Sequence, residues 1–170
     1  MKTIKNIKLR KINKPDMLYF LRWWKDKKLV KLTSGVYEKS DVVLKRYFLS
    51  LLQQKKNCHY MILLNKEIIG NVSLAQKSPR IFEMYIVIGE KKYWGKGLGT
   101  LVIKKILKIA FGKLNCRKVY LEVQSENLRA INAYKKCGFK KVGRRRCIRG
   151  KKFFVLIKME ITKSAFKKFG

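Results

Sequence analysis

The sequence predicts a single α+β domain over residues 1–170. A length of 170 residues is typical of one domain, and 47% hydrophobic residues are enough to form a core. Segments with the apolar pattern of strands are interleaved with segments that carry the capping and breaking residues of helices. In the second half of the chain the order is strand, helix, strand, helix, which supports the α+β class.

The first half of the chain is predicted to contain four strands and two helices. The strands are expected over 4–12, 60–64, 67–75 and 81–89. The helices are expected over 15–26 and 42–54, with a loop-like segment over 31–40 between them. Asn13 can cap the first helix, which has Pro15 in its first turn, and Ser40 or Asp41 can cap the second.

The second half begins with the stretch WGKGLGT, residues 94–100, in which three glycines fall at alternate positions. The apolar run that follows, up to residue 111, predicts a helix, and Gly112 is suited to cap its C-terminal end. A helix is also expected over 127–137, stopped by Gly138. The remaining strands are expected over 118–123, 139–148 and 153–161.

The glycine stretch is suited to bind an anion. Gly95, Gly97 and Gly99 do not fit a P-loop, because no lysine precedes Thr100, and they do not fit the dinucleotide motif GxGxxG. Without Cβ atoms the backbone can turn sharply and approach a ligand. The first N–H groups of a helix lack partners, and its dipole adds about half a positive charge there, which suits a pyrophosphate. A flexible turn is the alternative.

Cysteine and histidine usage does not predict a metal site. The four cysteines show no CxxC spacing, and the single histidine, His59, directly follows Cys58, which is poor geometry for two ligands of one metal. We therefore expect neither a metal nor a disulfide framework. Free thiols and the lack of an apolar signal segment favour the cytoplasm, and no apolar run approaches the ~20 residues of a membrane span.

The charge of the chain is strongly positive. Forty-three Lys and Arg residues face ten Asp and Glu residues, a formal net charge of +33. One interpretation is an acidic partner such as RNA or the ribosome. The other is a lysine-rich genome, which the even spread of the lysines favours. The densest basic block, residues 144–152, lies between two predicted strands and is explained equally well as the rim of a hairpin.

Two motifs in the second half resemble the GNAT superfamily of acetyl-coenzyme A-dependent N-acetyltransferases. The family loop Gln/Arg-x-x-Gly-x-Gly/Ala falls on residues 94–99, where Trp94 replaces the usual Gln or Arg. The later family motif, Asn-x-x-Ala-x-x-x-Tyr-x-x-x-Gly-Phe, is matched in full over residues 127–139. The resemblance is strong over 81–140 and consistent in element order elsewhere.

The resemblance implies a fold, a cosubstrate and a binding site. The fold would be a mixed central sheet of about six to seven strands with about four flanking helices. The strand over 83–88 would splay from its neighbour over 120–123 and hold acetyl-coenzyme A, with no metal involved. The implied cofactor-binding residues are Ile86, Val87, Ile88, Trp94, Gly95, Lys96, Gly97, Leu98, Gly99, Thr100, Asn127 and Tyr134.

The resemblance also implies the catalytic groups. Tyr134 matches the general acid that protonates the departing thiolate, and we expect nearby lysines to lower the pKa of its phenol. Glu122, which resembles the base of the ribosomal-protein alanine N-acetyltransferases, and Glu83, which other branches use, are the two candidate bases. The alternatives are a core tyrosine and two glutamates in salt bridges.

The acceptor amine is left open by the sequence. A protein N-terminus, such as that of a ribosomal protein, is the first hypothesis, and a polyamine or an aminoglycoside is the second. Trp23, Trp24 and Tyr37 lie where the family builds its acceptor lid, although the tryptophans are equally suited to pack a helix on the sheet. From another class, the chain could be a non-enzymatic basic module that binds RNA or the ribosome, with a relic cofactor site.

Overall fold

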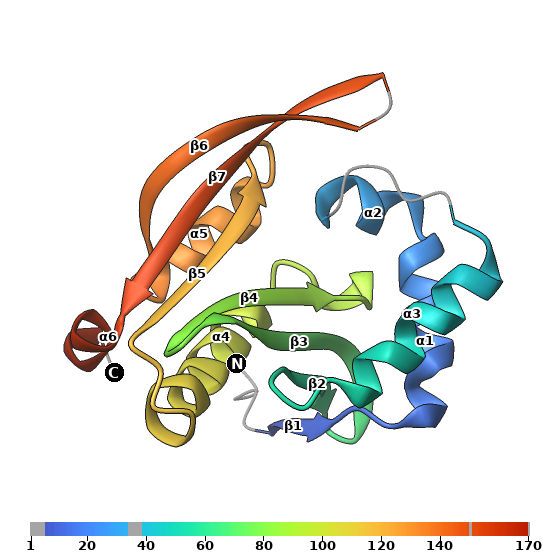
Figure 1. The fold of residues 1–170 in the computed structure, drawn as a ribbon, viewed down its shortest axis with the longest axis horizontal. Helices are drawn as coiled ribbons and strands as arrows, with labels where there is room; N and C mark the ends of the chain where they lie inside the picture. The colour runs from blue at the N-terminus through green and yellow to red at the C-terminus, as the bar shows by residue number, and fades with distance from the viewer. Residues whose placement is uncertain (1–5, 34–38, 150, 170) are drawn as a thin grey trace.

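One mixed sheet forms the centre of the protein (Figure 1). The computed structural model describes residues 6–33, 39–149 and 151–169. The strands are β1 (Ile7–Lys11), β2 (Cys58–Leu64), β3 (Glu67–Ser78), β4 (Ile81–Ile88), β5 (Lys118–Gln124), β6 (Lys140–Arg149) and β7 (Lys152–Thr162). They form a seven-stranded sheet in the order β1-β2-β3-β4-β5-β7-β6, in which the pairing of β4 with β5 is parallel and the pairing of the other neighbours is antiparallel. The predicted fold class is confirmed.

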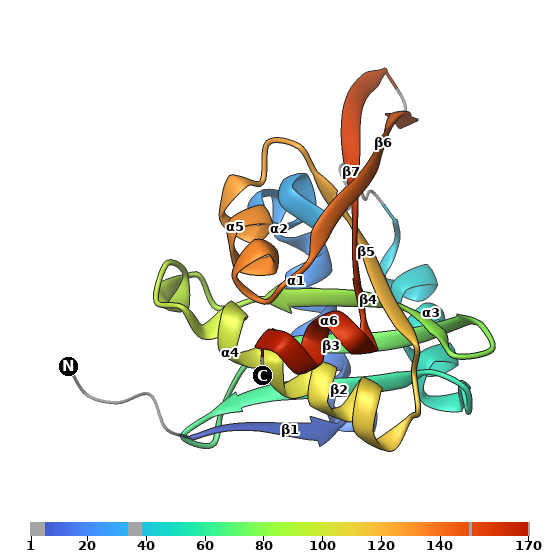
Figure 2. The same ribbon diagram turned by 90° about the vertical axis from the view of Figure 1, so that its left-hand side faces the viewer.

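Helices cover both faces of this sheet (Figures 1 and 2). Those of the described residues are α1 (Met17–Lys25), α2 (Lys27–Thr33), α3 (Asp41–Gln53), α4 (Leu98–Lys108), α5 (Leu128–Lys136) and α6 (Lys163–Phe169). The first three share one apolar cluster with the sheet, and the last three share another. None of the helices in this part of the chain is long and apolar enough to cross a membrane.

The sequence analysis missed α2 and α6. Each is only seven residues long, which is too short for a clear period of 3.6 residues. Each begins beside a side-chain oxygen that accepts a backbone hydrogen bond. Asp26 Oδ1 accepts from the N–H groups of Lys28 and Leu29 at 3.0 and 3.1 Å, and Thr162 Oγ1 accepts from that of Ala165 at 3.2 Å. Asp26 therefore both ends α1, as its C-cap, and starts a second helix.

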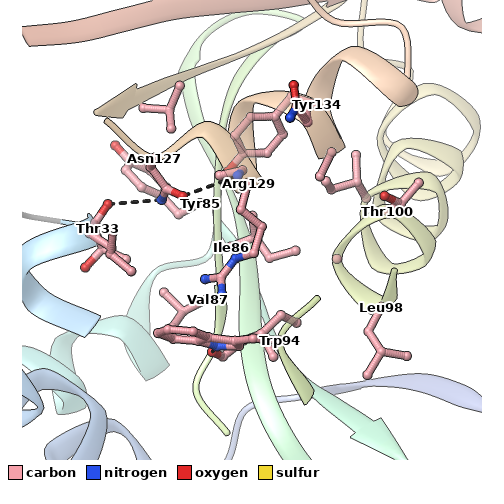
Figure 3. A pocket seen from close by; sticks show the side chains of 18 of the residues that line it. Thr33, Tyr85, Ile86, Val87, Trp94, Leu98, Thr100, Asn127, Arg129 and Tyr134 are labelled. Carbon is pink, nitrogen blue, oxygen red and sulfur yellow. Dashed lines mark hydrogen bonds between the residues drawn. The ribbon is translucent and has the colours of Figure 1, made fainter. Parts of the chain in front are cut away.

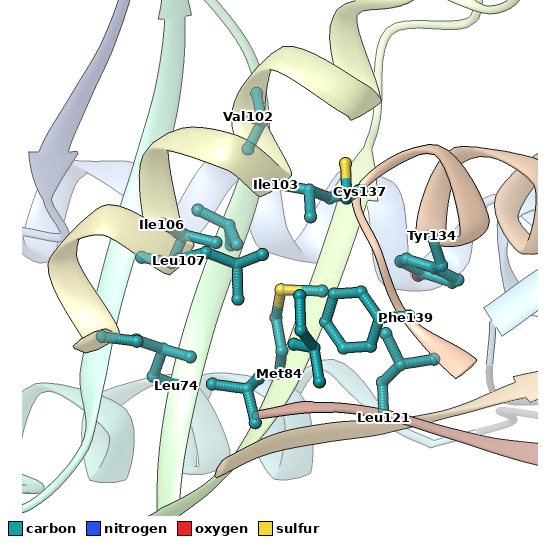
Figure 4. Packing of buried hydrophobic residues seen from close by; sticks show 14 of the residues in the cluster. Leu74, Met84, Val102, Ile103, Ile106, Leu107, Leu121, Tyr134, Cys137 and Phe139 are labelled. Atoms are coloured by element: carbon teal, nitrogen blue, oxygen red, sulfur yellow. The ribbon is translucent and has the colours of Figure 1, made fainter. Parts of the chain in front are cut away.

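Helix α4 packs against one face of the sheet (Figure 4). Its buried face packs against β3 and β4, where Leu74 and Met84 are buried in the same cluster. The predicted cap at Gly112 is wrong, because the helix continues as a π-helical turn over Ile109–Lys113. The left-handed residue that follows is Asn115, with φ 47°. Gly138, with φ 92°, does follow α5 as expected.

Strands β4 and β5 separate soon after they begin. Their register pairs are Ile81 with Lys118, Phe82 with Val119 and Glu83 with Tyr120, and no pair follows within the two described strands. Each strand stays paired on its other side, β4 with β3 and β5 with β7. The edges that face each other beyond Glu83 therefore keep backbone N–H and C=O groups available to a ligand between them.

Candidate active site

The separation of β4 from β5 leaves a cavity of about 380 Å³ that is lined from both faces of the sheet (Figure 3). Volumes of about 300–1,000 Å³ are usual for small-molecule sites. Ile86 packs with the apolar cluster under α4, whereas the next residue, Val87, packs with the cluster under α1 and α3, and both line the cavity. Leu29, Leu32 and Thr33 of α2 line it on the side of Val87.

Most of the residues expected to bind the cofactor meet in this cavity. Those that line it are Ile86, Val87, Ile88, Trp94, Gly95, Gly97, Leu98, Gly99, Thr100, Asn127 and Tyr134. Lys96 is the exception, because its side chain lies outside the lining and its ammonium is 5.6 Å from the centre of the Tyr93 ring.

The glycine loop is open toward the cavity. Gly95 and Gly97 both have φ +76°, and Gly97 is the N-cap of α4. A Cβ atom built on Gly95, Gly97 or Gly99 would meet no atom within 4 Å. The space beside the loop is therefore available to a ligand. Together with the free N–H groups at the start of the 11-residue helix α4, it fits the pyrophosphate of acetyl-coenzyme A.

Asn127 connects α5 to α2 at the cavity. Its Oδ1 accepts a hydrogen bond from the N–H of Ala130 at 3.2 Å, so Asn127 caps the N-terminus of α5. Its Nδ2 donates to the carbonyl of Leu32 at 3.3 Å. Both polar atoms of the side chain are thus engaged within the protein, and the side chain is fixed beside the cavity.

Tyr134 lies on the buried face of α5 and lines the cavity. It is 8% exposed, and its ring lies 5.8 Å from that of Phe139. Burial raises the pKa of the Tyr134 phenol, and the neighbouring Cys137 acts in the same direction. The expected lowering by lysines is wrong, because the ring is enclosed by apolar side chains. A raised pKa keeps the phenol protonated at neutral pH, and it also makes the phenol a weaker acid toward a departing thiolate.

The two candidate bases occupy different places. Glu122 lines the cavity, whereas Glu83 lies among the pairs where β4 and β5 are still joined. Arg145 holds Glu122 with two hydrogen bonds of 2.8 and 2.6 Å, which lower the pKa of that carboxyl, although partial burial opposes them. Glu83 is buried and pairs with Lys77 at 2.9 Å. Both glutamates are therefore in salt bridges, which was the alternative to a role as catalytic base.

The tryptophans expected in an acceptor pocket do not line the cavity. Trp23 is 4% exposed and donates from Nε1 to Glu90 at 3.2 Å, and Trp24 packs against the rings of Phe20 and Tyr47. Both belong to the packing of α1 on the sheet, as the alternative interpretation had it. Tyr37 lies outside the described residues.

Sequence reasoning missed several lining residues. Leu29, Leu32 and Thr33 belong to the unpredicted helix α2. Tyr85 lies in the predicted strand over 81–89 without having been singled out, and Arg129 occupies a position that the recognised motif leaves unspecified. Among the described residues, no group of three or more His, Cys, Asp or Glu side chains is arranged to hold a metal ion.

A parallel strand pair that separates beside a glycine loop at a helix N-terminus defines the architecture of an acetyl-coenzyme A-dependent acetyltransferase. The sequence matches the acetyltransferase (GNAT) domain over residues 6–140, so the chain belongs to this family. It is an N-acetyltransferase that takes the acetyl group from acetyl-coenzyme A and transfers it to an amine. The alternative of a non-enzymatic basic module is not supported.

The chain is similar to two curated acetyltransferases. The chain is 28% identical over 150 residues to spermidine N(1)-acetyltransferase from Escherichia coli K12, covering 82% of this chain and 75% of the relative. It is 25% identical over 152 residues to aminoglycoside N(6′)-acetyltransferase type 1 from Klebsiella pneumoniae, covering 81% and 76%. These relatives are not ribosomal-protein N-terminal acetyltransferases, so that part of the resemblance is not supported, and neither is a ribosomal or nucleic-acid partner.

A solved structure has the same fold. The spermidine N-acetyltransferase from Vibrio cholerae, in complex with CoA and spermine, superposes with a TM-score of 0.85 at 23% identity, covering 95% of this chain and 98% of that one. At this identity the likeness establishes the fold.

The open glycine loop generates a prediction about cosubstrate binding. Gly99→Val should weaken acetyl-coenzyme A binding at least tenfold, because the new side chain fills the space beside the loop. The melting temperature should not fall, since Gly99 does not have positive φ and valine is no worse than glycine in a helix. Calorimetric titration and thermal melting measure both effects.

Gly112→Val is the matched control, because Gly112 is also open and helical but lies beyond the other end of α4. It should bind acetyl-coenzyme A like the parent. Equal affinity in Gly99→Val and Gly112→Val would contradict the placement of the pyrophosphate.

Proposed function

We propose that the protein acetylates a primary amine of a small molecule, of the kind represented by polyamines and aminoglycosides. The observation that carries the proposal is the similarity to spermidine and aminoglycoside acetyltransferases over more than four fifths of the chain. The cavity supports it, because a donor bound at the glycine loop leaves the side lined by Tyr85, Glu122 and α2 for an acceptor.

Charge is the main obstacle to a polycationic acceptor. The sequence has ten Asp and Glu residues, and all but Glu38 lie in the described part of the chain. Eight of these nine carboxylates are in ion pairs with Lys or Arg, and Glu126 is the exception. With a net charge of +33, the protein would repel a multiply charged amine at a distance.

An acceptor assay tests this function. Release of the coenzyme A thiol from acetyl-coenzyme A should be at least tenfold more efficient, as kcat/KM, with spermidine or ribostamycin than with a peptide that has an N-terminal alanine. Raising the salt concentration from about 20 to about 150 mM should raise kcat/KM for spermidine, because screening weakens the repulsion. A preference for the peptide would contradict the proposal, and a fall with salt would show that unpaired carboxylates attract the polyamine.

We assign the proton acceptor to Glu122 rather than Glu83, because Glu122 lines the cavity. Its lowered pKa keeps the carboxylate ionised throughout the neutral range but also makes it a weaker base, so its role is to take the ammonium proton through a water molecule. The amine nitrogen then attacks the acetyl carbonyl carbon, and the tetrahedral intermediate collapses with cleavage of the C–S bond. Tyr134 supplies the proton that the departing thiolate takes up, and the second proton of the amine nitrogen restores the phenol.

Glu122→Gln should lower kcat at pH 7 by roughly 10²–10⁴, the usual contribution of general acid–base catalysis. Most of the loss should disappear as the pH approaches the pKa of the acceptor amine, where the free amine forms unaided. Glu83→Gln is the matched control and should retain a rate near that of the parent. The opposite ranking in pH–rate profiles of the two variants would transfer the role to Glu83.

Tyr134→Phe should lower kcat at least tenfold while the affinity for acetyl-coenzyme A changes less than twofold. The ring and its packing remain, and only the proton donor is lost, so the effect falls on the transition state. In the parent, no loss of activity from ionisation of this phenol is expected up to about pH 10, because burial raises its pKa.

Tyr60→Phe, in a half-buried position on β2 outside the cavity, is the control for loss of a phenol hydroxyl. Its kcat should equal that of the parent. If Tyr134→Phe also retained the parent's kcat, Tyr134 would be a packing residue and water would be the proton donor.

A further inference from the structure

Arg129 is a cation at the cavity that no carboxylate neutralises among the described residues. It lies in the first turn of α5, and the eight ion pairs of that part of the chain do not include it. Its guanidinium instead lies 3.8 Å from the centre of the Trp94 ring, as Figure 3 shows. An arginine stays charged at neutral pH, so the cavity contains a positive charge with no negative partner among the residues that the structure describes.

Trp94 is a fixed platform for this guanidinium. Its Nε1 donates a hydrogen bond to the carbonyl of Ile88 at 2.7 Å, which ties the ring to the end of β4. The ammonium of Lys28 lies 5.5 Å from the centre of the same ring. A guanidinium stacked on an aromatic face keeps its N–H groups at its edges, where they remain available to an anion.

The guanidinium faces the same cavity as the anion-binding loop. Arg129, Gly95, Gly97 and Gly99 all line it, and Trp94 directly precedes the first of these glycines. The loop contributes backbone amides and the dipole of α4, and Lys96 is not among the residues that line the cavity. Arg129 therefore brings a full positive charge from α5 to the cavity, where the loop offers only partial charges.

We propose that Arg129, supported by the Trp94 ring, binds the pyrophosphate of coenzyme A opposite the amides of the glycine loop. A planar guanidinium can donate two parallel hydrogen bonds to phosphate oxygens, which a lysine ammonium cannot reproduce. The ligand class is thus a diphosphate ester with a pantetheine arm. The inference concerns the donor and is independent of which amine is the acceptor.

Titration calorimetry with three ligands tests the proposal. Coenzyme A carries the pyrophosphate and a 3′-phosphate, dephospho-coenzyme A keeps only the pyrophosphate, and pantetheine has neither. Arg129→Ala should raise Kd at least tenfold for the first two and leave the affinity for pantetheine unchanged. Arg129→Lys should recover only part of the loss, and Trp94→Leu should weaken binding of the same two ligands by removing the platform.

Lys135→Ala is the control, since Lys135 is an exposed cation on the same helix outside the cavity, and it should change Kd less than twofold. Melting temperatures of all variants should stay close to the parent's. A loss confined to coenzyme A would place Arg129 on the 3′-phosphate and overturn the proposal. An equal loss with pantetheine, or no loss in Arg129→Ala, would also overturn it.

Discussion

Strands β4 and β5 are joined by three register pairs, and the site depends on the absence of further pairs between these two strands. Two parallel strands that stayed paired would close the sheet and leave no path through it. Here β3 and β7 keep the outer edges of the two strands in place, so their inner edges separate without unfolding either strand. The unused backbone groups on these edges would be costly if they were buried without partners, which favours a ligand with amide groups between the strands.

The helices on the two faces of the sheet contribute different residues to the gap between β4 and β5. Helix α4 brings the glycine loop and its dipole, and α5 brings Tyr134 and Arg129, all from one layer. The other layer contributes α2, whose last turn is hydrogen-bonded to Asn127. A single side chain thus connects the layer that carries the proposed catalytic tyrosine with the layer that lines the acceptor side.

Much of the fold could be predicted from local patterns in the sequence. Apolar runs bounded by turn residues located all seven strands, and the apolar run after the glycine stretch and the motif over 127–139 located α4 and α5. Short helices that depend on one capping side chain, such as α2 at Asp26, lack a periodic pattern and were missed. Burial was not predictable either, since an aromatic side chain such as Trp23 suits a core and a pocket equally well. The pairing of Glu122 with Arg145 joins β5 to β6, a contact that no sequence spacing reveals.

The lining of the cavity from both faces has a consequence for the order of events. A donor held at the glycine loop and the acceptor proposed on the side of Tyr85 would occupy different parts of this cavity at the same time. Neither substrate then has to leave before the other arrives, and no side chain has to carry the acetyl group in between. The architecture suits direct transfer within a ternary complex, for which initial-rate plots at several donor concentrations give intersecting rather than parallel lines.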